Sequence, residues 1–231
     1  MTRLFYQSWA VWLSLLTAVA SPPGASTRPP AAQAGDLAAP IFTVPSTEKA
    51  IVLTFDDGPH PTRTPLVLRA LKKHKMKAVF FVLGKNAKRY PGIIQAIVKH
   101  GHQVASHGYA HANMKKLSPA QIAKELDDTT AALQAAGAQA FYFRPPYGIY
   151  TKSLEKQLAL RHLRLVMWSI DSMDWSSKHT AGMTDKITKK LKPGRILLLH
   201  DIQAHTATHI DAILSAIDQA GYTTIPLPTA P

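Results

Sequence analysis

Short apolar runs alternate with helical segments through most of this sequence. Most of the runs are continuously apolar, as expected for parallel strands that are buried on both faces. We predict strands at residues 51–57, 78–84, 103–107, 140–146, 165–171, 196–201 and 223–228. This alternation indicates an α/β fold. We expect a distorted (β/α) barrel with about seven parallel strands, and the alternative is a doubly wound open sheet.

Residues that typically start and end helices fall between the predicted strands. Thr64-Pro65 predicts a helix start, with a capping threonine and a proline in the first turn. Ser118 and Gln121 fit a capping box, in which each side chain bonds the other residue's backbone N–H. Gly101 and Gly137 follow helical segments, where glycine commonly ends a helix. We find no long internal repeat, so one folded domain is expected.

The first 20 residues have the pattern of a secretory signal peptide. Arg3 gives a positive start, Trp9 to Ala20 form an apolar stretch, and Ala18-Val19-Ala20 fits a cleavage site. The stretch is short for a membrane span, so an uncleaved anchor is the alternative. Residues 21–47 are rich in Pro and Ala and are predicted to be a flexible leader before a folded domain at 48–231. We therefore expect a secreted or periplasmic protein.

Composition limits the ligands and partners. The chain has no cysteine, so disulfides and thiolate metal sites are excluded, and a metal must use His, Asp, Glu or water. The net charge of +13 would suit nucleic acid, anionic envelope polymers or acidic lipid, although lysine-rich helix exteriors give the same count. Because export is predicted, we expect no nucleic-acid partner. We also expect a monomer without a stable protein partner.

Polar clusters stand where five of the predicted strands end. They are Asp56-Asp57, the run from Ser106 to His111, the run from Arg144 to Gly148, the run from Asp171 to Trp175, and His200-Asp201. In a barrel, the C-terminal ends of parallel strands meet at one edge, where functional residues gather. We therefore expect the five clusters to converge. Asp201 itself is interpreted as a solvated strand-end carboxylate.

His107 and His111 are four residues apart. On a helical turn this spacing would place both imidazoles on one face, where they could share a cation. Two histidines and a strand-end carboxylate form a common metal site that leaves positions open for water. The alternative is that both are ordinary surface histidines. The accompanying clusters favour a metal site.

Taken together in this order, the five clusters resemble the motifs of the polysaccharide deacetylase family, the NodB-homology domain of carbohydrate esterase family 4. The resemblance covers residues 48–228, and it implies a distorted barrel with fewer than eight regular units. It implies that Asp56 is the general base and that Arg144 orients it. Asp57, His107 and His111 would be the metal ligands. The metal would be Zn²⁺, with Co²⁺, Ni²⁺ or Mn²⁺ as alternatives.

The remaining roles also follow from the resemblance. His200 would be the general acid, and Asp174 would tune it, with Asp171 as a competitor for that role. Tyr147 would offer a backbone N–H to the oxyanion and place its ring beside the sugar. Trp175 would wall the groove, and Leu198 would line the acetyl pocket.

The implied activity is hydrolysis of N-acetyl groups on N-acetylglucosamine residues of an extracytoplasmic glycan. Candidate substrates are peptidoglycan, chitin oligomers and poly-N-acetylglucosamine. One alternative is an O-acetyl esterase acting on a polysaccharide such as acetylated xylan, and another is an inactive glycan-binding module. The chain departs from the family at Gly108, where Ser or Thr usually follows the first metal histidine and helps to fix the loop. The support of that loop must therefore differ here.

Overall fold

The computed structural model of the protein describes residues 39–176 and 182–228. The predicted signal peptide at 1–20 lies outside the described residues, so the structure does not bear on it. Among the described residues, no helix is both long and apolar enough to span a bilayer.

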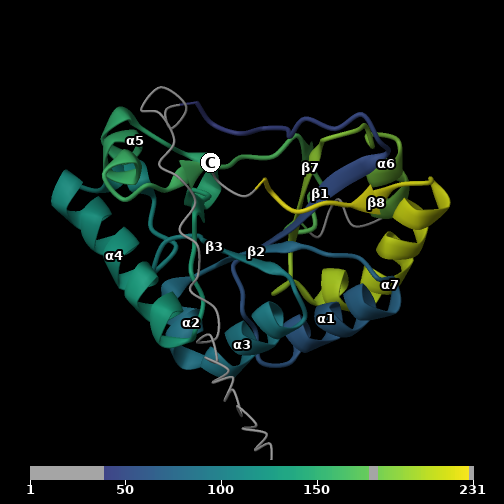
Figure 1. The fold of residues 1–231 in the computed structure, drawn as a ribbon, viewed down its shortest axis with the longest axis horizontal. Coiled ribbons are helices and arrows are strands. Elements are labelled where there is room, and N and C mark those ends of the chain that lie inside the picture. The colour runs from purple at the N-terminus through teal and green to yellow at the C-terminus, as the bar shows by residue number, and fades with distance from the viewer. Residues whose placement is uncertain (1–38, 177–181, 229–231) are drawn as a thin grey trace, which may run out of the picture.

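A curled parallel sheet forms the centre of the molecule (Figure 1). Its strands in the described ranges pair in the order β5-β4-β3-β2-β1-β7-β6, and β8 pairs with the start of β1. The strand pairs are all parallel, which confirms the predicted distorted barrel. The bounds are β1 (Ala50–Asp56), β2 (Val79–Val82), β3 (Gln103–Ser106), β4 (Tyr142–Phe143), β5 (Arg164–Leu165), β6 (Ile170–Asp171), β7 (Ile196–His200) and β8 (Thr223–Thr224).

The predicted strand at 165–171 is wrong, because it is two short strands at opposite ends of the sheet. β5 pairs with β4, whereas β6 pairs with β7. Leu165 and Ile170 are five residues apart, so an extended chain can separate them by at most about 18 Å. The two ends of the sheet must therefore curl toward each other. The predicted strands at 140–146 and 223–228 are also shorter than expected, with two paired residues each.

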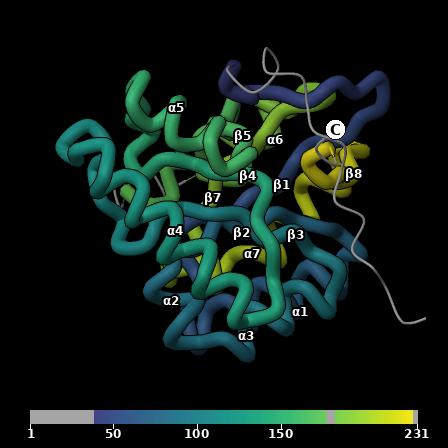
Figure 2. The backbone as a smooth tube through the Cα atoms, turned by 60° about the vertical axis from the view of Figure 1, so that its left-hand side comes forward, coloured from purple at the N-terminus to yellow at the C-terminus, as the bar shows by residue number. Residues whose placement is uncertain are grey.

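Seven α-helices of the described ranges surround the outside of the sheet as an arc (Figures 1 and 2). Neighbours in contact follow the order α5-α4-α2-α3-α1-α7-α6. The bounds are α1 (Arg63–Lys73), α2 (Gly84–Arg89), α3 (Pro91–Lys99), α4 (Pro119–Ala135), α5 (Lys152–Ala159), α6 (Met183–Thr188) and α7 (Ala204–Gln219).

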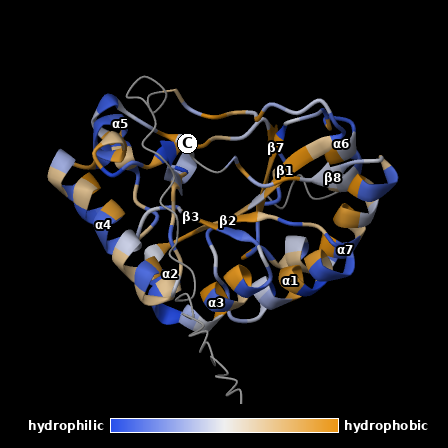
Figure 3. Cartoon of the chain, in the orientation of Figure 1, coloured by the Kyte–Doolittle hydropathy of each residue, from blue (hydrophilic) through white to orange (hydrophobic). Residues whose placement is uncertain are grey.

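Both faces of the central strand β1 are buried. Leu53 and Phe55 belong to the large core under the helix arc, whereas Val52 belongs to a second core on the inner face. This explains why the strands read as continuous apolar runs rather than as an alternating pattern. Figure 3 shows the same distribution, with hydrophobic strands inside and helices that are hydrophobic on one side only. Because β1 is buried along its whole length, its position in the sheet is fixed, and Asp56 is held at its C-terminal end.

The second core reaches further toward the N-terminus than predicted. Val44 is buried in it, and its N–H donates to the Gly194 carbonyl at 2.8 Å. Ile41 and Thr43 bridge to Val166 and Arg195. The packed part of the chain therefore begins before Glu48, because residues 41–44 cover apolar side chains of the inner face.

The helix signals are mostly confirmed. Ser118 and Gln121 form the predicted capping box of α4, and Gly137 follows that helix with a φ of 77°. The predicted cap of α1 is wrong, because the helix begins at Arg63 and the Thr64 hydroxyl lies within it. That hydroxyl instead donates to the Asp201 carboxylate, which draws Thr64 inward.

Candidate active site

A cavity of about 440 Å³ opens at the edge where β1, β6 and β7 end. It is lined by eight of the ten predicted site residues, namely Asp56, Asp57, His107, His111, Tyr147, Trp175, Leu198 and His200. The other two, Arg144 and Asp174, are buried beneath the lining and bond to Asp56 and His200. The predicted convergence of the five strand ends is therefore what the structure shows.

Asp57, His107 and His111 form a cluster that suits a metal ion. Their ligand atoms all lie within 4.8 Å of one another. The Nε2 atoms of His107 and His111 lie 3.4 Å and 3.3 Å from Asp57 Oδ1. Ligand distances of about 2.0–2.1 Å in a tetrahedral site place neighbouring ligand atoms about 3.3–3.4 Å apart. The spacing of the three side chains therefore fits a small divalent cation.

The hydrogen bonds around the cluster favour the same conclusion. The Nδ1–H of His107 donates to the Arg144 carbonyl at 2.7 Å, which leaves the Nε2 lone pair directed at the cluster. Asp57 Oδ1 is buried and accepts no hydrogen bond from the described residues, as expected of an oxygen reserved for a cation. Burial lowers the pKa of His111 against the opposing charge of Asp57, which favours the neutral imidazole that a metal ligand must be.

The expectation that His107 and His111 share a helical turn is wrong. Residues 107–111 form a loop after β3, and the two rings meet because the backbone turns sharply. Gly108 has a φ of 80° and His111 a φ of 63°. Asp57 and Tyr147 also have positive φ, at 73° and 63°. Left-handed conformations of residues other than glycine gather at functional sites, where the surrounding structure enforces them.

Arg144 is buried beneath the cavity lining and forms an ion pair with Asp56. Its guanidinium donates to Asp56 Oδ1 at 2.7 Å and to the Thr54 hydroxyl at 2.8 Å, and it also bonds the Met167 carbonyl. The guanidinium is fully buried and lies over the Phe81 ring at 4.0 Å. Two buried opposite charges are tolerated because each offsets the desolvation of the other. Asp56 is thereby fixed in orientation while its second oxygen faces the cavity.

His200 lies beside Asp56 at the edge of the site. The two are register partners on the adjacent strands β1 and β7. Asp174 accepts hydrogen bonds at 2.7 Å from both Nδ1 and the backbone N–H of His200, and at 2.5 Å from the Thr206 hydroxyl. Burial lowers the pKa of His200, but the hydrogen bond and charge of Asp174, with the charges of Asp56 and Asp57, raise it to about 9. His200 is therefore protonated at neutral pH.

Asp171 does not take the position beside His200. Its Oδ1 accepts the Met173 N–H at 2.8 Å, so it shapes the turn that carries Asp174 while also lining the cavity. Tyr147 and Trp175 stand at the cavity mouth with exposed fractions of 64% and 53%. Leu198 is buried at the cavity floor. A broad aromatic rim above a small apolar floor suits a sugar ring with a short acyl group.

Asp201 is not the solvated carboxylate that the sequence suggested. It is fully buried, it accepts the Thr64 hydroxyl, and a Cβ at Gly58 would lie 2.5 Å from its oxygens. Burial raises the pKa of Asp201 to about 7. Sequence reasoning also missed Thr206, whose contact with Asp174 depends on how α7 packs. For Asp201, the one sequence feature that could have indicated a buried position near the site was that it directly follows His200.

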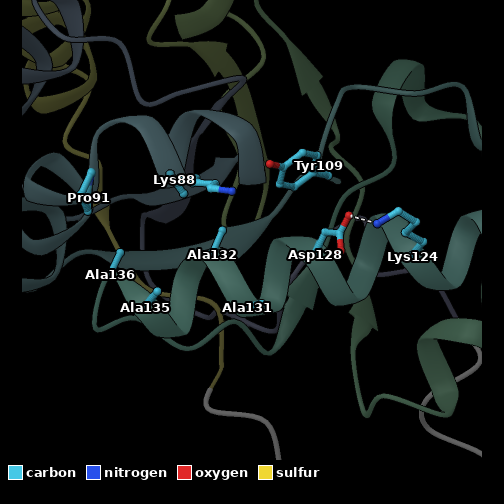
Figure 4. Close-up of a pocket in the computed structure, with 10 residues that line it drawn as sticks. Lys88, Pro91, Tyr109, Lys124, Asp128, Ala131, Ala132, Ala135 and Ala136 are labelled. Atoms are coloured by element: carbon cyan, nitrogen blue, oxygen red, sulfur yellow. Dashed lines mark hydrogen bonds and ion pairs between the residues drawn. The ribbon is translucent and has the colours of Figure 1, made fainter.

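A second cavity of about 550 Å³ lies between α2 and α4, and none of the ten predicted site residues lines it (Figure 4). Alanines of α4 line its floor, and Tyr109, Lys88 and the Lys124–Asp128 ion pair stand around it. Tyr109 belongs to the loop between His107 and His111. The second cavity therefore touches the back of the candidate metal site.

Comparisons with known proteins find a family and several relatives that this chain resembles. The family described as polysaccharide deacetylase matches residues 43–166. A peptidoglycan-N-acetylglucosamine deacetylase of Listeria monocytogenes is 36% identical over 177 residues, which is 76% of this chain but 37% of that protein. The chain thus spans little more than a third of that relative.

Two further similarities cover nearly the whole of the other protein. A chitooligosaccharide deacetylase of Bradyrhizobium is 32% identical over 199 residues, which covers 79% of this chain and 91% of that protein. A solved family 4 carbohydrate esterase from Streptomyces lividans, in complex with acetate, superposes with a TM-score of 0.72 at 33% identity. It covers 76% of this chain and 91% of that structure.

Proposed function

The chain belongs to the polysaccharide deacetylase family, and from this premise we propose that it is a metal-dependent N-deacetylase. Its substrate would be N-acetylglucosamine residues of an extracytoplasmic glycan. The observation that carries the proposal is that a carboxylate and a protonated imidazole lie side by side in one cavity. Asp56 and His200 are direct register partners, and the Asp57–His107–His111 cluster lies beside them.

The metal fits this donor set of one carboxylate and two neutral imidazoles, with zinc as the first choice. When bound, a divalent metal polarises the acetamide carbonyl and makes water a better nucleophile. Asp57, His107 and His111 would hold it, and the cavity beside them leaves space for the acetamide.

The side chains around the cavity would then share the proton transfers. Asp56, oriented by Arg144, accepts the proton of the attacking water. His200, kept protonated by Asp174, donates a proton to the departing amine nitrogen. Among the described residues the Tyr147 N–H donates to no backbone carbonyl outside the helices and strands, so it would be available for the developing oxyanion. Acetate and a free amino sugar are the products.

The compartment and the polymer are parts of the same proposal. The signal-like pattern of residues 1–20 favours a secreted or periplasmic protein, and glycans with N-acetylglucosamine occur in that setting. One similar protein is named for peptidoglycan and another for chitooligosaccharide, so both substrate types are candidates.

Acetate release from a panel of glycans tests the proposal. Purified full-length protein should release acetate from peptidoglycan, chitin oligomers or poly-N-acetylglucosamine, stop in the presence of a chelator, and recover with Zn²⁺ or Co²⁺. If metal-loaded protein releases no acetate from any of the three, the proposal is wrong.

An O-acetyl esterase is the second candidate, and the similarity to a solved carbohydrate esterase with acetate favours keeping it. The same base, acid and metal ligands would serve an ester. Acetate release from acetylated xylan, compared with chitin oligomers at equal acetyl concentration, separates the two. An inactive glycan-binding module is disfavoured, because the base, the acid and all three ligand side chains are in place.

A further inference from the structure

The loop between the two metal histidines, residues 107–111, is held by hydrogen bonds from two directions. On one side, the backbone N–H groups of Gly84 and Lys85, at the start of α2, donate to the carbonyls of Gly108 and Tyr109 at 3.0 Å and 3.1 Å. These bonds fix the carbonyl side of the loop. They leave its N–H groups to be satisfied elsewhere.

Glu125 of α4 satisfies two of those N–H groups. Its Oε2 accepts the N–H of Tyr109 at 2.7 Å and the N–H of Ala110 at 3.0 Å. One carboxylate oxygen thus spans two consecutive peptide units between the metal histidines. Charge-assisted hydrogen bonds of this kind are stronger than those between neutral groups. Glu125 therefore holds the loop from the side opposite to α2.

Gly108 makes this arrangement necessary. The residue is buried with a φ of 80°, a conformation that side-chain-bearing residues seldom adopt. A Cβ there would lie 3.1 Å from Met114 Cε and 3.3 Å from Glu125 Oε2. The resemblance to the family implies a Ser or Thr hydroxyl at this position, and glycine cannot supply one. Glu125 lies where such a side chain would extend, so a partner on α4 takes over the support of the loop.

The ring of Tyr109 adds a third attachment. It projects into the second cavity between α2 and α4, near the Lys124–Asp128 pair (Figure 4). It packs so closely on Gly84 that a Cβ there would lie 2.6 Å from the ring. The backbone of the loop is therefore clamped between two helices, and its histidines point the other way, into the catalytic cavity.

We propose that Glu125 is a positioning residue of the metal site, which sets the geometry of His107 and His111 through the loop backbone. The inference rests on the proposed function in that the histidines must hold a metal. His111 has a φ of 63°, a left-handed conformation that persists only where the surrounding structure enforces it. Without the Glu125 acceptor, the loop relaxes and His111 Nε2 leaves its place 3.3 Å from Asp57 Oδ1.

Direct titration of metal into the metal-free protein tests this without relying on turnover. Zn²⁺ affinity is measured by calorimetry, and Co²⁺ absorption reports the ligand geometry. Glu125→Ala should weaken the metal Kd about 10–100-fold, as loss of a residue that orients a ligand typically does. Glu125→Gln should stay within about threefold of wild type, because a single amide oxygen can accept both N–H groups as Oε2 does.

Asp128→Asn is the matched control. Asp128 lies one turn further along α4 and pairs with Lys124 at 2.8 Å, whereas the loop N–H groups of Tyr109 and Ala110 donate to Glu125. Its replacement removes the same charge from the same helix, so the metal Kd should not change. If Glu125→Ala does not fold, Glu125→Asp replaces it, because the shorter side chain cannot span both N–H groups and should also weaken the Kd.

Two results would overturn the inference while leaving the proposed function intact. One is a folded Glu125→Ala protein, or a Glu125→Asp protein in its place, with the metal Kd and the Co²⁺ spectrum of the wild type. Glu125 would then stabilise the fold without positioning the histidines. The other is a Glu125→Gln protein as weak as the alanine variant, which would assign the effect to charge. A wild-type protein that binds no metal would overturn the proposed function and this inference together.

Discussion

Replacing Asp174 by Asn should remove most of the pH dependence that His200 gives to the stability of the fold. Asp174 is buried and accepts three hydrogen bonds, two from His200 and one from Thr206. Asn preserves the shape and removes the charge. Because Asp174 is the main cause that raises the pKa of His200, the variant should titrate near or below the ordinary value of 6.5.

The size of the effect follows from linkage. A pKa of about 9 in the folded protein, against 6.5 when unfolded, corresponds to about 3 kcal/mol. Because the folded-state pKa is raised, this stabilisation is fully present below the unfolded pKa and is lost as the pH rises through the folded one. The wild type should therefore lose about 3 kcal/mol of unfolding free energy from His200 between about pH 6 and about pH 9.5, and the variant much less.

Urea unfolding of metal-free protein at the two pH values measures the difference, and NMR titration of the His200 ring measures the pKa directly. Metal must be absent, because a cation held by Asp57 would offset part of the charge that raises this pKa. Asp171→Asn is the control, since Asp171 bonds the Met173 N–H rather than His200. Equal pH dependence in wild type and Asp174→Asn, or a wild-type His200 that titrates near its ordinary pKa, would refute the reasoning.

Other changes test the buried groups around the site. Asp201→Asn should flatten the fall in stability between about pH 4 and 7, because burial raises the Asp201 pKa to about 7 and the folded state holds that proton more tightly. The same fall in urea unfolding of the wild type and of the Asp201→Asn protein over this range would contradict this. Arg144→Met should cost about 3–5 kcal/mol by leaving Asp56 buried without its partner, and adding Asp56→Asn should recover part of that loss in urea unfolding. Ser118→Ala should cost about 1 kcal/mol in thermal unfolding through loss of the α4 capping box, and no loss would mean that the cap is replaced by water.

The site could be predicted from the sequence because the end of each strand can be recognised locally, and the C-terminal ends of parallel strands meet at one edge of the sheet. Asp56 follows a run that is apolar on both faces, and His200 ends another, so a parallel sheet brings them to one edge whatever the helices do. Ser118 and Gly137 likewise act through neighbouring backbone groups, and α4 begins and ends where they predict. Such features depend on residues close in sequence.

What the sequence could not show depends on distant partners. The run from Leu165 to Ile170 contains no breaker, so only pairing with β4 and β7 reveals two strands. Asp201 looks solvated until Thr64 of α1 and the Gly58 backbone cover it. The loop at Gly108 could be recognised as unusual, but its support by Glu125 required the position of α4.

The most direct test of the account is acetate release by Asp56→Asn protein at the metal content of the wild type. Asp56 touches the cavity but is not among the three ligand side chains, so the variant should still bind metal. Wild-type protein should deacetylate chitin oligomers, and the variant should lose at least about 100-fold in kcat, the contribution typical of a general base. A metal-loaded Asp56→Asn protein with wild-type acetate release would contradict the central claim that Asp56 and His200 share the proton transfers.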